Sequence, residues 1–564
     1  MVNINNPKTF LYDPLLPNLN DWPIVQLSKN RTNFIREVID TSMLRITSST
    51  NGSLKDELAK TLYLEKTRII EKPWSVDPKD EKEFWEEVKH HLLQSAAKNG
   101  TEDINKDEEN KKILYEIVSR YVHEMAGSFN IPTYSFAKKV LPIGFSRLLN
   151  ASLGKNLKAK WNGAEFNIHD KMHLTGDVEA IRNLATKGTI IMVPTHFSNL
   201  DSIVMGWAIQ TLGLPAFLYG AGLNLFGIKA FSYFMNRLGA YKVDRRRKNL
   251  TYLETLKTYS TLALHKDCHS LFFPSGARSR SGSIESKLKL GLLGTAMDAQ
   301  FLNFKNASVD KAKKIFIVPV VINYHFVLEA PYLIDEYLKT TGREHYLIDE
   351  SDKFSTSYEI LKFLLKFFTA SSDFTLSFGK GMDLFGNVVD QDGRSIDHHG
   401  REIDIRNYFI SKGELRSDKQ RDAEYIKMLG DKILESYHSE NTVFTSHIVA
   451  FTAFEVLKKQ YPKLDTYGLL RLPEEDRIIS YERFATTIER LRNELINLSS
   501  LGKLRFTSQM SVEELIADGI RNVGIYHTKK VLKRKKNGDI TTQDMKLLYY
   551  YHNRLEGYDL ARFI

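Results

Sequence analysis

Short β-branched runs alternate with helical patterns in the middle of this chain, and this alternation constrains its fold more than any other feature. The runs begin at about Thr189 and read TIIMV, YKV, SLFF and IFIVPVVI, with helical patterning between them at 199–212, 248–265 and 287–300. Strands that alternate with helices build an α/β domain. In such domains the strand ends and the loops after them carry the chemistry.

The segments on either side of this region are mainly helical in pattern. At 564 residues the chain is long enough for several domains. We expect a helical N-terminal domain at 1–140, an α/β domain at 141–406 and a helical C-terminal domain at 407–564. Inside the first domain, the polar stretch from Ala96 to Lys112 predicts a solvated loop or linker.

The composition excludes several classes of protein. Hydrophobic residues make up 42% and charged residues 26%, which argues against a disordered or fibrous chain. No transmembrane helix or signal peptide is expected, because no apolar run is long enough and the N-terminus lacks a basic start with an apolar core. Cys268 is the single cysteine, so a reducing cytosolic setting is expected. The net charge of +10 favours anionic partners.

Two residue types suited to base catalysis follow the strand TIIMV. His196 comes directly after this strand, and Asp201 follows in the run THFSNLD. On one continuous helix the two side chains would point about 140° apart, so a turn must bring them together. A paired Asp201 would fix the tautomer of His196 and leave its second nitrogen to accept a proton from a hydroxyl. The alternative is structural, because Ser198 and Asp201 also have the spacing of a capping box.

Arginines follow the next two strands. Arg245 is the first of three arginines after YKV, and a guanidinium at a strand end suits a phosphate. The loop after SLFF offers guanidinium groups, hydroxyl donors and a glycine that admits a ligand close to the backbone. Its candidate binding residues are Ser275, Gly276, Arg278, Ser279 and Arg280. A solvated charge run is the alternative for both segments.

Two further features have no assigned chemistry. His398 and His399 are adjacent in a polar turn, where we expect a solvated loop rather than a metal site. No metal site is expected elsewhere. The basic run KKVLKRKK, from Lys529 to Lys536, would add attraction to anionic headgroups. With a pI near 9.1, this run keeps a basic nucleic-acid-binding protein open as an alternative of another class.

Four blocks occur in order along the chain: THFSNLD, GAYKVDRR, FFPSGARSRSG and IVPVVINY. In this combination they resemble the glycerolipid acyltransferases with a His-x4-Asp motif, and YGAGLNLFGIKAFSYFMNRLGAYKVDRR is similar to the bacterial membrane-associated glycerol-3-phosphate acyltransferases. The resemblance covers about residues 185–330. It implies an acyltransferase domain with a central mixed sheet flanked by helices.

The resemblance also implies a reaction. A fatty acyl group would pass from acyl-CoA or acyl-carrier protein to the sn-1 hydroxyl of glycerol 3-phosphate, the first step of phospholipid synthesis. Acylation of 1-acylglycerol 3-phosphate is the alternative within the same class. No cofactor is expected beyond the acyl thioester, and no nucleic acid is expected as a partner. The expected location is the cytoplasmic face of a membrane, held by peripheral contact with its anionic surface.

Individual residues match the blocks of this family. His196 matches the general base, and Asp201 matches the acid that orients it. The acceptor-binding positions of the later blocks correspond to Arg245, Gly276, Arg278 and Pro319. The chain departs from the family at Ser275, where a glutamate is common. Losing that carboxylate removes a negative charge near the expected phosphate pocket.

Overall fold

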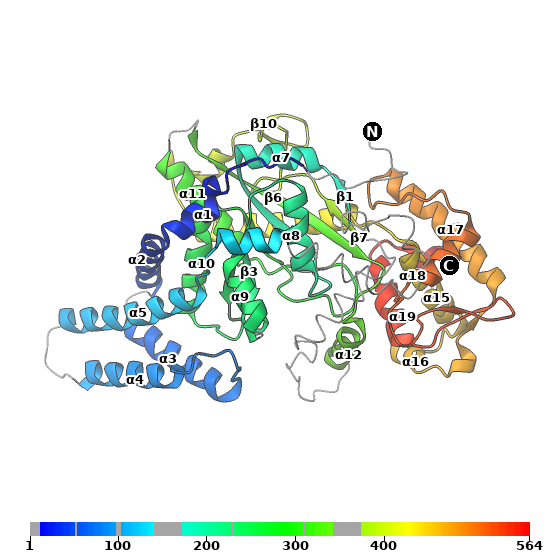
Figure 1. The fold of residues 1–564 in the computed structure, drawn as a ribbon, viewed down its shortest axis with the longest axis horizontal. Helices are drawn as coiled ribbons and strands as arrows, with labels where there is room; N and C mark the ends of the chain where they lie inside the picture. The colour runs from blue at the N-terminus through cyan, green and yellow to red at the C-terminus, as the bar shows by residue number, and fades with distance from the viewer. Residues whose placement is uncertain are drawn as a thin grey trace.

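The computed structural model describes residues 12–50, 53–97, 103–139, 172–227, 229–307, 311–341 and 374–564. A seven-stranded sheet lies at the centre, flanked by helices, with the N-terminal helices at one end of the molecule (blue) and the C-terminal helices at the other (orange to red; Figure 1). This confirms the predicted fold class. The predicted boundary at 140/141 lies outside the described residues, and the one at 406/407 falls in the 3-10 helix η6 (Ile405–Phe409).

The strand order of the sheet is β1-β7-β6-β2-β5-β3-β4. Every neighbouring pair is parallel except β6 with β7, so the sheet is mixed. The carboxyl ends of the parallel strands β2 to β6 therefore meet at one edge, where ligands of α/β proteins bind. The strands are β1 (Met172–Gly176), β2 (Gly188–Pro194), β3 (Leu218–Gly222), β4 (Ala240–Val243), β5 (Ser270–Leu271), β6 (Lys314–Tyr324) and β7 (Phe374–Phe378).

The helices between the strands follow the predicted pattern, with one shift. α8 (Asp201–Thr211) and α10 (Leu250–His265) occupy the predicted segments, but α11 (Leu293–Asn306) begins later than the predicted start at 287. The loop before α11 folds back on itself, and the backbone N–H of Lys289 donates to the carbonyl of Pro274 at 2.7 Å. The remaining helices here are α7 (Val178–Lys187), η4 (Leu223–Gly227), α9 (Lys229–Arg237) and α12 (Ala330–Thr341).

Strand β3 was not predicted. It lies inside the apolar stretch from Leu214 to Phe234. Leu218 and Ala221 of β3 are buried, so this part of the stretch belongs to the core. The sequence LYGAG contains no β-branched residue and two glycines, which is why strand propensity does not reveal it.

The N-terminal helices share a hydrophobic core with α10. They are η1 (Leu19–Asp21), α1 (Pro23–Lys29), α2 (Arg31–Ser49), α3 (Leu54–Glu71), α4 (Glu81–Ala97) and α5 (Asp103–Met125). Because α4 ends at Ala97 and α5 begins at Asp103, the loop predicted from Ala96 to Lys112 is wrong for residues 96–97 and 103–112, and residues 98–102 lie outside the described ones.

The C-terminal helices share the main hydrophobic core with the central sheet. They are α14 (Lys419–Ser439), α15 (Thr445–Gln460), α16 (Thr466–Leu470), η7 (Glu474–Asp476), α17 (Tyr481–Ser500), α18 (Val512–Asn522), α19 (Met545–His552), η8 (Asn553–Leu555) and η9 (Leu560–Phe563). Short strands accompany them: β8 (Val388–Val389), β9 (Ser395–Ile396), β10 (Glu402–Ile403), β11 (Ile410–Ser411), β12 (Glu414–Leu415), β13 (Ile478–Ile479), β14 (Lys533–Arg534) and β15 (Ile540–Thr541). In the described ranges, no helix is both long and apolar enough to cross a membrane.

Candidate active site

A turn between β2 and α8 brings His196 and Asp201 together. β2 ends at Pro194 and α8 begins at Asp201, so the histidine lies in the loop and the aspartate in the first helical turn. Nδ1 of His196 lies 2.8 Å from Oδ2 of Asp201, which also accepts the backbone N–H groups of Phe197 (2.6 Å) and Ser198 (2.9 Å). The capping-box alternative is met by half: Asp201 accepts the Ser198 backbone N–H, but the Ser198 hydroxyl accepts the N–H of Leu200 at 3.2 Å rather than that of Asp201.

The imidazole of His196 is held in place but reachable. Its ring stacks on Phe273, with 4.1 Å between centroids and 23° between planes. The side chain is 13% exposed, whereas that of Asp201 is fully buried. An N–H at Nδ1 donates to the carboxylate, which leaves Nε2 with a lone pair that can accept a proton.

Tyr324, at the end of β6, completes the contacts of Asp201. Its hydroxyl donates to Oδ1 of Asp201 at 2.7 Å. Burial, followed by the charge of Asp201, raises the pKa of Tyr324 well above its usual range, so the phenol keeps its proton. Both oxygens of the buried carboxylate are thus hydrogen-bonded, which is what a buried charge requires.

Glu329 connects the loop containing His196 to the loop after β5. Its carboxylate accepts from the backbone N–H of Asn199 at 2.9 Å and from the Ser198 hydroxyl at 3.1 Å. It also lies 3.3 Å from Nη1 of Arg278. Because Glu329 is buried, these contacts fix Arg278 relative to the base.

Two predicted binding residues of the loop after β5 have structural contacts. The backbone N–H of Ser279 donates to the carbonyl of His196 at 2.7 Å, and its hydroxyl donates to the carbonyl of Ser283 at 2.7 Å. Arg280 forms an ion pair with Glu336 at 2.9 Å. Ser279 therefore supports the base loop through its backbone, while Arg280 is held toward α12.

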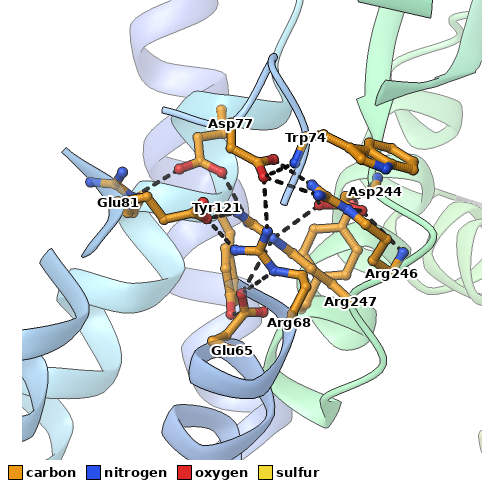
Figure 2. A network of polar contacts seen from close by, with 12 residues as sticks. Glu65, Arg68, Trp74, Asp77, Glu81, Tyr121, Asp244, Arg246 and Arg247 are labelled. Atoms are coloured by element: carbon orange, nitrogen blue, oxygen red, sulfur yellow. Dashed lines mark hydrogen bonds and ion pairs between the residues drawn. The ribbon is translucent and has the colours of Figure 1, made fainter. Parts of the chain in front are cut away.

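The three consecutive arginines point to different places. Figure 2 shows Arg246 and Arg247 in a network with acidic side chains of the N-terminal helices and the loop between α3 and α4. Arg246 also stacks on Trp74, with its guanidinium carbon 3.9 Å from the ring centroid. Arg245 is exposed, and within the described parts of the chain no acidic group forms an ion pair with it. It is the arginine of this run that can receive an anionic ligand.

Arg245 belongs to a group of cations at this edge of the sheet. Partial desolvation and then the charge of Arg278 lower the pKa of Arg245. Desolvation, followed by the charges of Arg245 and Arg280, likewise lowers the pKa of Lys289. Mutual repulsion of this kind is relieved when a phosphate binds among the cations.

Gly276 makes room for this lysine. Its φ is +72°, and a Cβ there would lie 2.6 Å from Cδ of Lys289. The neighbouring Ser275 donates its hydroxyl to the carbonyl of Ala277 at 2.8 Å, so it caps the turn of its own loop. Pro319 lies inside β6, paired with Val193 of β2, and its side chain is buried. It is therefore placed in the sheet rather than at the strand end.

The adjacent His398 and His399 lie exposed in a turn. In the parts of the chain that the structure describes, no cluster of three or more His, Cys, Asp or Glu side chains could hold a metal ion.

Comparison with known proteins finds relatives of the central domain. Residues 176–323 match the family model described as Acyltransferase. A glycerol-3-phosphate acyltransferase of Pseudomonas aeruginosa strain UCBPP-PA14 is 25% identical over 251 residues, which cover 44% of this chain and 26% of the relative. The glycerol-3-phosphate acyltransferase of Pseudoalteromonas translucida is 34% identical over 163 residues, which cover 28% of this chain and 18% of the relative.

Residues 176–323 thus resemble the acyltransferase family, and the similarity of this chain to glycerol-3-phosphate acyltransferases is confined to 163 to 251 residues. The chain spans about a quarter of the length of the first of these relatives. Among solved structures, the 1-acyl-sn-glycerophosphate acyltransferase of Thermotoga maritima aligns at 12% identity over 67% of this chain and 93% of its own, with a TM-score of 0.24. A TM-score this low supports no conclusion about shared fold or function.

Several residues at this site were not among the predicted ones. Lys289 and Glu285 lie in the segment that follows the third block, and Tyr324 ends the fourth, but none of them has a diagnostic spacing. Glu329 lies beyond the fourth block. Only the folded chain shows that Glu285, Tyr324 and Glu329 contact the segment from His196 to Asp201 and that Lys289 lies against Gly276.

Proposed function

We propose that this protein transfers a fatty acyl group from an acyl thioester to the sn-1 hydroxyl of glycerol 3-phosphate. The observation that carries the proposal is the pairing of His196 with Asp201 in a loop that Glu329 connects to the cation Arg278. A base near a hydroxyl, together with cations for a phosphate, is what acylation of a phosphorylated alcohol requires. The names of the relatives support glycerol 3-phosphate as that alcohol.

In the proposed reaction, Nε2 of His196 accepts the proton of the sn-1 hydroxyl of glycerol 3-phosphate. The oxygen of that hydroxyl attacks the carbonyl carbon of the thioester at the same time. Asp201 holds the imidazole through Nδ1 and stabilises the imidazolium that forms. The tetrahedral intermediate collapses with cleavage of the carbon–sulfur bond, and the imidazolium returns its proton to the thiolate. The ester and a free thiol are the products. The acyl thioester, acyl-CoA or acyl-carrier protein, is a co-substrate, and no cofactor takes part.

The proposal is tested with purified protein, labelled glycerol 3-phosphate and palmitoyl-CoA. We expect His196→Ala to lower kcat by about 10² to 10⁴, the usual contribution of a general base. His398→Ala, which alters an exposed histidine in a turn, is the matched control and should keep the wild-type rate. Near-normal turnover by His196→Ala would contradict the assignment.

The acceptor is tested by offering 1-acylglycerol 3-phosphate in place of glycerol 3-phosphate. Both compounds carry the phosphate that Arg245 and Arg278 would bind. Both also carry a free hydroxyl from which His196 would accept a proton. We expect kcat/KM to be higher for glycerol 3-phosphate. A higher kcat/KM for the 1-acyl compound would reassign the acceptor and leave the role of His196 intact.

We also propose that the protein contacts anionic membrane surfaces on the cytoplasmic side. The basic run from Lys529 to Lys536 presents Lys529, Lys530, Lys533, Arg534, Lys535 and Lys536 as exposed cations, partly on the β14 strand. Near an anionic surface each such cation contributes roughly 1 kcal/mol. Flotation with vesicles of phosphatidylglycerol is expected at low salt, and its absence would contradict the proposal.

A further inference from the structure

The C-terminal region lies beyond the residues that match the family model, yet it contacts three of the four blocks. Asn553 donates to the carbonyl of Ser281 at 2.9 Å, and the Tyr551 hydroxyl accepts from the backbone N–H of Val327 at 3.1 Å. Gly282 has a φ of +86°, and a Cβ there would lie 2.2 Å from the carbonyl oxygen of Tyr550. α19 and η8 therefore pack directly on the loop after β5 and on the segment after β6.

Arg554, in η8, reaches the base loop itself. Its guanidinium carbon lies 3.8 Å from the centroid of the Phe197 ring, next to the histidine in the chain. Nη2 donates to the carbonyl of Ile322 at 2.8 Å and to Oδ1 of Asn323. Arg554 is buried, so its charge acts on its neighbours with little screening by water.

Glu285, which lies in the segment between β5 and α11, also contacts the loop of His196. Its Oε1 accepts the backbone N–H of His196 at 2.8 Å, and the side chain is buried. Burial raises the pKa of Glu285 to about 7, while the bond from His196 and the charge of Arg554 act in the other direction. Burial lowers the pKa of Arg554 to about 10, and the carboxylate of Glu285 is the largest influence that opposes this shift. Each group favours the charged form of the other, and the two side chains contact consecutive residues of one loop, Glu285 at His196 and Arg554 at Phe197.

We propose that Arg554 and Glu285 form a positioning pair that holds the backbone of the His196 loop, so that the C-terminal region completes the active site. Neither residue touches a substrate in this account. Glu285 fixes the main chain of His196 by its hydrogen bond, and Arg554 fixes Glu285 by its charge and Phe197 by its contact with the ring. The inference rests on the proposed function, because the residue that the pair positions, His196, is the base of that reaction.

The test is a double-mutant cycle on the full-length protein. Arg554→Met and Glu285→Ala should each lower kcat about 10- to 100-fold and change KM for glycerol 3-phosphate less than about 2-fold, since the loop of the base moves and the cations do not. The double variant should be no slower than the slower single variant, because both substitutions remove the same support. Glu285→Gln keeps an oxygen acceptor for the His196 N–H but loses the charge that attracts Arg554, so it should recover only part of the rate that Glu285→Ala loses.

A matched control separates this role from a general structural one. Arg562→Met alters an arginine of the same C-terminal segment whose side chain is 59% exposed, and it should leave kcat unchanged. Additive losses in the double variant, or a normal kcat in folded Arg554→Met, would overturn the proposal.

Hydrogen exchange provides a readout that needs no activity. Backbone amide hydrogens in the peptide covering residues 195–200 should exchange faster in folded Arg554→Met than in the wild type. The exchange rate of α2, which serves as the reference, should be the same in both. Unaltered exchange in that peptide would overturn the positioning role. A wild type without acyl transfer would contradict the proposed function alone, because the exchange result stands independently of it.

Discussion

The two helical flanks hold different parts of the candidate site by different physical means. The N-terminal helices reach the segment after β4 through the ionic network of Figure 2, where Glu81 and Asp77 meet Arg247 and Arg246. The C-terminal helices share the apolar core of the sheet and reach the His196 loop through Arg554 and α19. The first flank thus supports the segment of Arg245, and the second supports the loop of His196, the proposed base.

The two flanks should therefore affect different steps of the proposed reaction. Damage at the N-terminal interface should change binding of the acceptor phosphate, because the neighbours of Arg245 are held there. Damage at the C-terminal interface should change the rate of the chemical step, because the loop of the base is held there. Separate effects on KM and kcat therefore distinguish the two.

The largest expected effect on stability comes from Arg247, the centre of the ionic network. It lies 2.9 Å from Glu124 and 3.0 Å from Glu81. Arg247→Met removes one of the two arginines that face the buried Glu81, with Arg68 as the other, and we expect it to lower the free energy of unfolding by about 3 kcal/mol. Urea denaturation measures this loss.

The control for this substitution is Arg394→Met. Arg394 pairs with Asp390 at the surface, with 51% of its side chain exposed, so its removal should cost less than about 1 kcal/mol. Equal losses for the two variants would show that the network contributes no more than a surface ion pair.

A smaller effect is expected for Asp77→Asn. Asp77 accepts from both Nη1 and Nη2 of Arg246, next to Arg245 in the chain. Without this charge pair the segment after β4 is less well held, and KM for glycerol 3-phosphate should rise about 3- to 10-fold with kcat nearly unchanged. Steady-state kinetics with Asp80→Asn, which removes a neighbouring exposed carboxylate, supplies the control. A fall in kcat with KM unchanged would remove the proposed division between the flanks.

The smallest effect concerns the acid sensitivity of the C-terminal flank. Burial lowers the pKa of His527 to about 3, and its Nε2 lies 2.8 Å from the Tyr551 hydroxyl. Between about pH 6.5 and 3 the unfolded chain binds a proton here that the folded chain does not, so the free energy of unfolding falls as the pH is lowered. The slope is at most about 1.4 kcal/mol per pH unit.

His527→Gln should reduce this slope, measured by denaturation at pH 7, 6 and 5. The exposed His398, substituted in the same way, should leave it unchanged. An identical slope in His527→Gln and wild type would show that this histidine does not couple acid to the C-terminal flank.

The sequence predicts the centre of the fold better than its edges. β2 and β6 are long and rich in β-branched residues, so their patterns are clear, whereas the glycine-rich β3 has no such pattern. The helical start of α5 at Asp103 was predicted as a loop, because its acidic residues are typical of solvated segments as well as of helix N-termini.

The candidate site could be predicted where its residues are close in the chain. The turn between His196 and Asp201 follows from local spacing, and the geometry is as required for a paired base. Glu329 and Arg554 lie far from His196 in sequence and reach it only through the packing of β6 and the C-terminal helices. Their roles, and the binding roles assigned to Arg245 and Arg278, remain predictions for the variants above.

The central claim is that His196 acts as the base in acyl transfer to glycerol 3-phosphate. The most direct measurement is the rate of free-thiol release from palmitoyl-CoA, with and without glycerol 3-phosphate, by wild type and His196→Ala. We predict acceptor-dependent release by the wild type and a loss of about 10² or more in the variant. Release that does not depend on the acceptor, or that His196→Ala preserves, would contradict this claim.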